Sequence, residues 1–260
     1  MVFEDWMMPP RQMAVKRQKA PQSFIASDAL NRTQSCPIIR IVIAAMMAIS
    51  MAAWLQPNLD TSIASFFYCP IEGFWLARDP LLKTLRSAGR MVPTIIIVWV
   101  LALIAIRLIR GRAWQWPTDN NLVFLTGAFA IGPGIVVNLI LKEHWGRSRP
   151  EAIEAFGGSA QYTSPWWPWG ECATNCSFVS GEASTAMVLI AFAFICHRAF
   201  RLPIIAAATV WTIVISANRM AMGAHFFTDV VISALLTLLI VLVLKATVID
   251  TNQPRHIGKA

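Results

Sequence analysis

Residues 225–247 decide the fold of this chain, and their sequence is HFFTDVVISALLTLLIVLVLKAT. Nearly all of the stretch is apolar, and it exceeds the roughly 20 residues that a helix needs to cross a bilayer. His225 and Asp229 stand at its beginning, four residues apart, so a helix places them on one face. An imidazole whose ring proton is accepted by a carboxylate has a fixed tautomer and a free second nitrogen. The stretch therefore predicts a membrane helix that carries a reactive histidine.

The rest of the chain has the composition of a membrane protein. Hydrophobic residues make up 56% of it and charged residues 14%, against roughly 25% charged residues in soluble domains. We expect an all-α, polytopic membrane protein with six transmembrane helices and with both termini in the cytoplasm. The predicted spans are residues 38–56, 91–109, 121–141, 183–200, 203–217 and 226–247. The span over 203–217 is the shortest of the six.

The predicted domain organisation is one membrane domain with two polar ends. Residues 1–36 are polar and basic and lack the apolar core of a cleaved signal peptide, so we expect a disordered cytoplasmic arm before an uncleaved first span. Residues 37–250 form the six-helix membrane domain, and residues 251–260 form a cytoplasmic tail. The sequence contains no internal repeat, and nothing in it fixes an oligomeric state.

The basic residues give the orientation of the spans. The net charge is +8, but the Lys and Arg residues lie beside the apolar runs without interleaved aromatic residues, so nucleic acid is excluded as a partner. With the termini in the cytoplasm, the outside holds eight of the 22 Lys and Arg residues, in agreement with the positive-inside rule. Four of these eight are Lys142, Arg147, Arg149 and Arg219.

Three short segments carry the candidate site, and this topology places all of them at the outer face of the membrane. They are KEHWGRSRP at residues 142–150, SGE at 180–182 and RMAMGAHFFTD at 219–229. A cluster of fixed cations is suited to hold a multiply charged anion such as phosphate. The expected site is therefore that of a phosphatase that passes phosphate through His225.

Each segment also permits a simpler interpretation. Ser180 can be a plain cap of the following helix, or the cap can be combined with an anion site at the backbone N–H of Gly181. Arg147 has more of the character of a side chain that extends to the interface than of a ligand, and we place it with His144 at a substrate rim. The case for a site depends on the joint occurrence of these residues on one side.

The three segments resemble the signatures of the type 2 phosphatidic acid phosphatase superfamily, which also contains the vanadium haloperoxidases. Those signatures are Lys-x6-Arg-Pro, Ser-Gly-His and Ser-Arg-x5-His-x3-Asp, and the resemblance covers roughly residues 90–245. It implies a six-helix core, no metal or other cofactor, and a phosphohistidine on His225. The residues that it implies for phosphate binding are Lys142, Arg149, Ser180, Gly181 and Arg219.

The chain departs from these signatures at two positions. Asn218 replaces the Ser before Arg219, which is a small polar change. Glu182 replaces the His that protonates the leaving oxygen, and a carboxyl group can do so only while it is itself protonated. Glu182 is the predicted acid; His144 is an alternative donor, and a sugar 1-phosphate or a pyrophosphate needs less acid catalysis. A weakened or inactive enzyme is the remaining alternative.

The segment between the first two motifs bears on the substrate. Trp166, Trp167 and Trp169 are suited to an interface and predict a rim against the outer leaflet, although core packing explains them equally well. Residues 175–184 resemble the branch with bacterial lipid A phosphatases, so the expected partner is a lipid phosphate in the bilayer of the bacterial inner membrane, with the site facing the periplasm. Undecaprenyl pyrophosphate, phosphatidylglycerophosphate and phosphatidic acid remain open, as does a transporter or a non-catalytic lipid-binding protein. Cys172 and Cys176 can form a disulfide, and no Cys/His spacing is typical of zinc.

Overall fold

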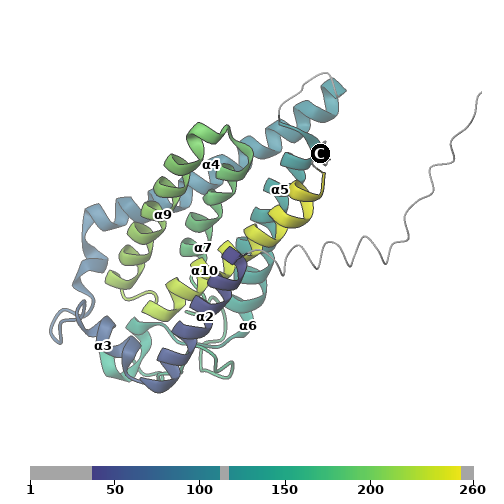
Figure 1. The fold of residues 1–260 in the computed structure, drawn as a ribbon. Coiled ribbons are helices and arrows are strands. Elements are labelled where there is room, and N and C mark those ends of the chain that lie inside the picture. The colour runs from purple at the N-terminus through teal and green to yellow at the C-terminus, as the bar shows by residue number, and fades with distance from the viewer. Residues whose placement is uncertain (1–36, 112–116, 253–260) are drawn as a thin grey trace, which may run out of the picture.

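A computed structural model of the chain describes residues 37–111 and 117–252 (Figure 1). The arm predicted over 1–36 and the predicted tail from residue 253 onward lie outside these ranges. Within them the regular structure is helical, apart from two isolated β-bridges. The longer elements are α2 (Pro37–Leu55), α3 (Leu59–Ser65), α4 (Pro80–Arg110), α5 (Asp119–Phe129), α7 (Gly181–Met187), α9 (Arg198–Ala221) and α10 (Phe227–Leu244). The shorter ones are η1 (Trp75–Arg78), η3 (Ala130–Leu141), α6 (Lys142–His144), η4 (Pro150–Ala152), η5 (Glu154–Phe156), η6 (Val188–Ala191), α8 (Phe192–Ile195), η7 (Lys245–Ile249) and η8 (Asp250–Asn252).

Five helices among the described residues are long and apolar enough to cross a membrane. They are Pro37–Leu55, Pro80–Arg110, Asp119–His144, Arg198–Ala221 and Phe227–Ile249. The predicted all-helical class is confirmed, and five of the six predicted spans have the length of a transmembrane helix.

The predicted fourth span is the exception. The apolar segment Gly181–Ile195 rises only about 22 Å at 1.5 Å per residue, less than the roughly 30 Å of a hydrocarbon core. It ends because Cys196 is extended and His197 caps the next helix, its Nδ1 accepting from Ala199 N at 3.4 Å. The predicted fifth span over 203–217, the shortest in the sequence, belongs instead to the 24-residue helix α9.

The short fourth segment lies in the middle of the bundle, where it contacts α4, α9 and α10. Small side chains make this possible, because Ala183 and Ser184 are fully buried. Ser184 and Thr237 of α10 share a hydrogen bond of 2.7 Å between their hydroxyl oxygens. Farther along, Val188 packs in the main apolar core with residues of α5 and α10.

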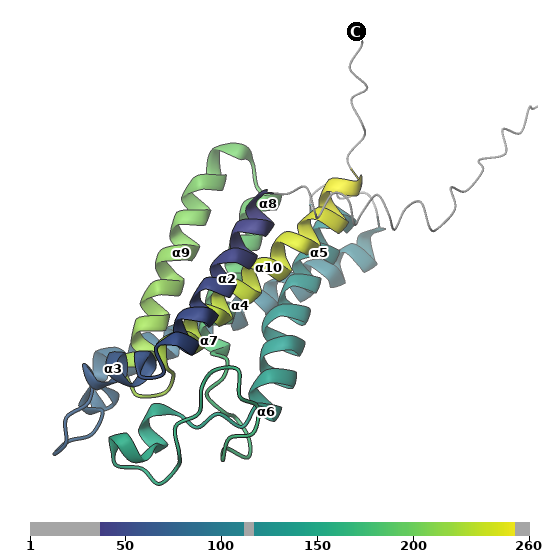
Figure 2. The same cartoon turned by 60° about the horizontal axis from the view of Figure 1, so that its bottom comes forward.

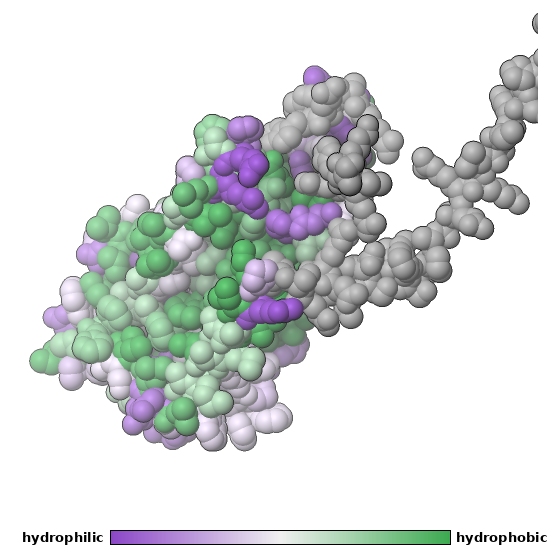
Figure 3. Space-filling model, viewed as in Figure 1, coloured by the Kyte–Doolittle hydropathy of each residue, from purple (hydrophilic) through white to green (hydrophobic). Residues whose placement is uncertain are grey.

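The outer helices present apolar side chains to their surroundings. In α2, α4 and α9 only 17% of the most apolar 18-residue stretch is buried, and Trp54 and Ile109 are 75% and 82% exposed. Figure 3 shows hydrophobic residues spread over the visible flank of the bundle. A helix that is apolar on its outward face is suited to lipid and not to water.

The longest connection of the chain lies at one end of the bundle. Figure 2 shows the long segment between α6 and α7 at the end where α10 begins, whereas α2 begins and α10 ends at the opposite end. The third span reaches this region without a break, because its Gly132-Pro133-Gly134 sequence lies within the π-helical segment η3. Asn138 donates from Nδ2 to the carbonyl oxygen of Pro133 at 2.7 Å. The third span and α9 therefore end, and α7 and α10 begin, at the same end of the bundle (Figure 2).

Candidate active site

The three predicted segments meet at a single pocket of about 450 Å³ at this end of the bundle. Lys142 comes from the end of the third span, Arg149 from the loop after it, Gly181 and Glu182 from the start of α7, and Arg219 from the end of α9. His225 lies between α9 and α10. The cationic side chains that line the pocket are Arg86, Arg90, Lys142, Arg149 and Arg219. One carboxylate, Glu182, faces them.

A tight turn positions His225. Gly223 has a φ of +67°, in the left-handed region, and a Cβ there would collide with the ring of Phe74. Glycine therefore lets the chain reverse between α9 and α10 and present His225 to the pocket. The ring is only 2% exposed.

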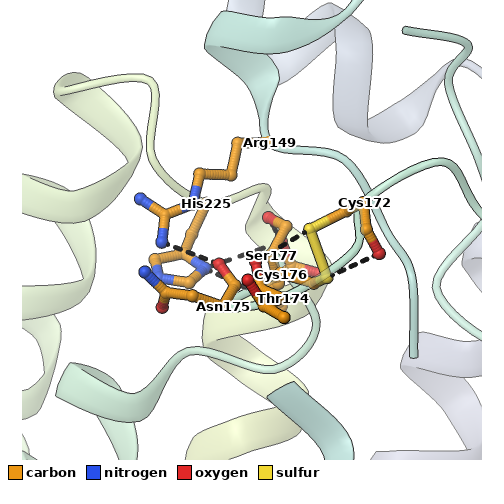
Figure 4. Close-up of a disulfide and its surroundings, with 8 residues drawn as sticks. Arg149, Cys172, Thr174, Asn175, Cys176, Ser177 and His225 are labelled. Atoms are coloured by element: carbon orange, nitrogen blue, oxygen red, sulfur yellow. Dashed lines mark hydrogen bonds and ion pairs between the residues drawn. A yellow bond between two sulfur atoms is a disulfide. The ribbon is translucent and has the colours of Figure 1, made fainter. Parts of the chain in front are cut away.

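The hydrogen bond of His225 fixes its tautomer. Its Nδ1 lies 2.7 Å from the carbonyl oxygen of Ser177. Figure 4 shows the ring beside Ser177. A carbonyl oxygen only accepts, so Nδ1 carries the proton and Nε2 holds the free electron pair. Burial lowers the pKa of His225, and the positive charges of Arg219 and Lys142 act in the same direction. The imidazole is thus neutral at pH 7, which is the form that a nucleophile requires.

Asp229 does not accept the ring proton directly, contrary to the expectation from the sequence. Its carboxylate lies 3.9 Å from His225 Nδ1, beyond hydrogen-bonding distance. Instead, Oδ2 accepts from Ser177 Oγ at 2.5 Å and from Phe226 N at 2.9 Å. The Asp229 carboxylate thus holds Ser177, and the carbonyl oxygen of Ser177 in turn holds the imidazole. The carboxylate also lies near enough to stabilise a positive charge on the ring.

Arg147 does not lie at a rim. Its side chain is fully buried, and its guanidinium makes ion pairs with Asp229 and, at 2.7 Å, with Asp60 of α3. It also lies 4.4 Å from the centre of the Phe226 ring. Burial opposes the charged form, but Asp229 and Asp60 outweigh it and raise the pKa of Arg147 above its ordinary value.

Asp60 is the part of this network that the sequence does not reveal. It is 1% exposed, and it accepts hydrogen bonds from Thr228 N at 2.9 Å and from Thr228 Oγ1 at 2.6 Å. The sequence around Asp60 contains no recognisable motif, and Arg147 is 87 positions farther along the chain. The sequence therefore gives no sign that the two residues pair. Two carboxylates and one guanidinium leave the network with one net negative charge, next to His225.

Of the five predicted phosphate ligands, four line the pocket: Lys142, Arg149, Gly181 and Arg219. Arg149 donates from one terminal nitrogen to the carbonyl oxygen of Asn175 at 2.9 Å, close to His225 (Figure 4). Ser180 is fully buried and does not line the pocket; it caps α7, its Oγ accepting from Ala183 N at 3.3 Å. Gly181 lines the pocket, and a Cβ there would come within 2.6 Å of Asn138 Oδ1.

Glu182 occupies the predicted acid position but is held by two cations. Its Oε2 pairs with Arg219, and its Oε1 lies 3.5 Å from Arg86 Nε. Both contacts place a guanidinium beside the carboxyl group of Glu182. Arg86 and Arg90 are pocket residues that the sequence signatures do not contain, and the available signal is two cations four residues apart ahead of an apolar run.

The remaining rim residues lie away from the pocket. His144 Nδ1 lies 3.0 Å from the Ile140 carbonyl oxygen of its own helical turn and does not line the pocket. Trp166 donates from Nε1 to Ser50 of α2 at 2.8 Å. Trp167 and Trp169 stack edge to face, are 54% and 74% exposed, and do not line it either.

A disulfide joins Cys172 to Cys176 in the loop before α7. The adjoining residues are bonded to the first motif, because Cys176 N donates to Lys142 O at 2.9 Å and Ser177 N to Arg147 O at 2.8 Å. These bonds fix Ser177 beside His225 (Figure 4). Among the described residues, no group of three or more His, Cys, Asp and Glu side chains is placed to hold a metal ion.

Comparison with known proteins identifies the class to which this fold and pocket belong. The sequence pattern of the PAP2 superfamily matches residues 121–252. A solved structure described as the first transmembrane PAP2-type phosphatidylglycerolphosphate phosphatase, from Bacillus subtilis, superposes with a TM-score of 0.56 at 18% identity, covering 84% of this chain and 98% of that one. The chain belongs to the PAP2 superfamily and is a membrane phosphatase, a hydrolase of phosphoric monoesters.

Named relatives are similar over most of their length. A lipid A 4'-phosphatase of Rhizobium leguminosarum is 34% identical over 171 residues, which is 66% of this chain and 72% of that protein. A lipid A 4'-phosphatase of Francisella tularensis subsp. novicida is 32% identical over 191 residues, 71% of this chain and 86% of that protein.

Proposed function

We propose that this protein is a lipid phosphatase that acts through a phosphohistidine on His225, with a lipid A-type phosphate as substrate. The observation that carries the proposal is the state of His225: neutral, protonated at Nδ1, and facing a pocket of five cations. The similarity to lipid A 4'-phosphatases supports the choice of substrate. No metal is required in this scheme, because the fixed cations supply the charge that a metal would supply.

The proposed reaction has two displacements at phosphorus. Nε2 of His225 attacks the phosphorus atom, the bond to the lipid oxygen breaks, and the lipid alcohol leaves with a proton. Water then attacks the phosphohistidine, loses its proton, and releases inorganic phosphate and free His225. Lys142, Arg149, Arg219, Ser180 and the N–H of Gly181 stabilise the negative oxygens in both steps.

Glu182 is proposed to exchange the proton of the leaving oxygen. An arriving phosphate competes with Glu182 for Arg219, which frees the carboxyl group to reach the leaving oxygen. Glu182→Gln is expected to slow the release of a poorly activated lipid alcohol much more than that of an activated phosphate ester such as nitrophenyl phosphate. Equal slowing of both would assign Glu182 to the orientation of Arg219.

The substrate proposal is tested by phosphate release from purified protein. Lipid A, undecaprenyl pyrophosphate, phosphatidylglycerophosphate and phosphatidic acid should be offered at equal surface density, each with and without EDTA. We expect the highest kcat/KM for lipid A and no effect of EDTA. Preference for another lipid would replace the substrate, and release that depends on a metal would replace the mechanism. Binding without release from any of the four would favour a non-catalytic lipid-binding protein.

We also propose that the pocket faces the periplasm at the bacterial inner membrane, with both termini in the cytoplasm. The distribution of Lys and Arg supports this orientation. Ser159 and Ser164 are exposed in the long loop beside the pocket. Cysteines at these positions, in protein without other free thiols, should react with an impermeant reagent in intact spheroplasts. Reaction only after lysis would place the pocket in the cytoplasm.

A further inference from the structure

Two of the five pocket cations lie outside the region that matches the superfamily. Arg86 and Arg90 belong to α4, one helical turn apart, whereas the superfamily pattern begins at residue 121. They line the same pocket as His225 although they form no part of the three signatures. Ionisable side chains of a transmembrane helix that face an internal cavity mark a functional site by default.

The charges of the pocket exceed what one phosphate requires. Five cations face a single carboxylate, Glu182, while His225 is neutral. One phosphate monoester with two negative charges leaves part of this positive charge unmatched. Arg90 has no carboxylate within ion-pair distance among the residues that the structure describes. A second anionic group would complete the balance.

Glu182 divides the cations into two groups. On one side it pairs with Arg219, which belongs to the group around His225. On the other side it faces Arg86 at 3.5 Å, and Arg90 follows one turn along α4. The α4 group is more open, since the side chain of Arg86 is 38% exposed while that of Arg219 is 3% exposed.

We propose that Arg86 and Arg90 form a second anion-binding subsite, which holds a second phosphate or carboxylate group of the same lipid. This inference rests on the phosphatase function proposed above. The first anion lies at His225, and the second lies along α4 beyond Glu182. The subsite therefore selects lipids with two anionic groups over lipids with one.

The test compares two synthetic acylated glucosamine lipids that carry either one phosphate or two and are otherwise identical. Their dissociation constants should be measured in a zwitterionic detergent at fixed salt, on protein with His225→Ala so that turnover does not interfere. Arg90→Gln should reduce the preference for the two-phosphate lipid about tenfold, as expected for one charge-assisted contact. Arg90→Lys should retain most of the preference.

Lys83 provides the matched control, because it is an exposed cation of α4 that does not line the pocket. Lys83→Gln should leave the preference as in the parent protein. Equal weakening of both lipids by Arg90→Gln, or no weakening of either, would overturn the subsite. Activity of the protein with intact His225 is measured separately: absence of phosphate release from both lipids would reject the phosphatase, while the binding ratio still decides the subsite.

Discussion

The two sides of the His225 ring are built in opposite ways. On the Nδ1 side, Asp229, Arg147 and Asp60 are at most 1% exposed and meet each other's charges in a closed network. On the other side, five cationic side chains and a single carboxylate line an open pocket. The closed network holds Ser177, whose carbonyl oxygen fixes the tautomer of the imidazole, whereas the open pocket is arranged for an anion that is not part of the protein. Substitutions on the two sides should therefore differ in kind.

The largest effect is expected at the ring that separates the two sides. His225→Ala should reduce phosphate release by roughly 10⁴-fold or more, because the nucleophile is lost. Circular dichroism and membrane insertion should remain those of the parent protein. Activity near the parent level would reject His225 as the nucleophile.

The next effect should fall on stability. Arg147→Met leaves two carboxylates buried without a counter-charge, and breaking a buried ion pair in this way costs about 3–5 kcal/mol. Asp60→Asn should cost less, because the pair between Arg147 and Asp229 remains balanced. Chemical unfolding in detergent measures both.

Lys142→Met is the comparison on the pocket side. It removes one of several like charges, so the free energy of unfolding should stay the same or rise. A loss of stability as large as that of Arg147→Met would show that the pocket side is also held together by its charges.

The affinity for an anion should depend on the pocket side, in contrast to the stability of the fold. Lys142→Ala is expected to weaken inhibition by vanadate or phosphate by about 1.5–3 kcal/mol, the range of a hydrogen bond to a charged group. Lys83→Ala, outside the pocket, should leave the inhibition constant unchanged. Equal inhibition of the Lys142→Ala protein would place the anion elsewhere.

The smallest effect concerns pH. Burial lowers the pKa of His225 below the value of about 6.5 that is ordinary for histidine. The imidazole therefore stays neutral at pH 6.5, and activity should fall only at more acidic pH. Lys142 also lowers this pKa, so Lys142→Ala should move the acid limb of the kcat/KM profile to higher pH. A limb at or above the ordinary value in the parent protein would contradict the buried neutral ring.

Much of the fold follows from the sequence because apolar runs of this length have few alternatives in a bilayer. The exception is informative. The run over 183–200 contains small residues such as Ala183 and Ser184, and these let the segment lie in the centre of the bundle as a shorter helix. Hydropathy measures how apolar a run is, but it does not distinguish lipid neighbours from protein neighbours.

The site divides in the same way. Lys142, Arg149 and Arg219 reach one pocket as their signatures predict, since each stands at or just after the end of a helix at the same end of the bundle. The role of Arg147 could not be predicted, because it depends on Asp60, whose position is set by how α3 packs on α10. Arg86 and Arg90 are missed for a related reason: the approach of α4 to α9 brings them to the pocket, and Gly89 with Ile215 at that contact leaves no trace in a motif.

The position of Asp60 makes the enzyme larger than its recognisable domain. A fragment cut to the region that matches the superfamily, 121–252, would keep every signature residue yet lose α3, and Arg147 would then lack one of its two buried counter-ions. The unit that can be moved, fused or minimised must begin before α3. In this protein the region of sequence similarity is therefore shorter than the structural unit that holds the active site.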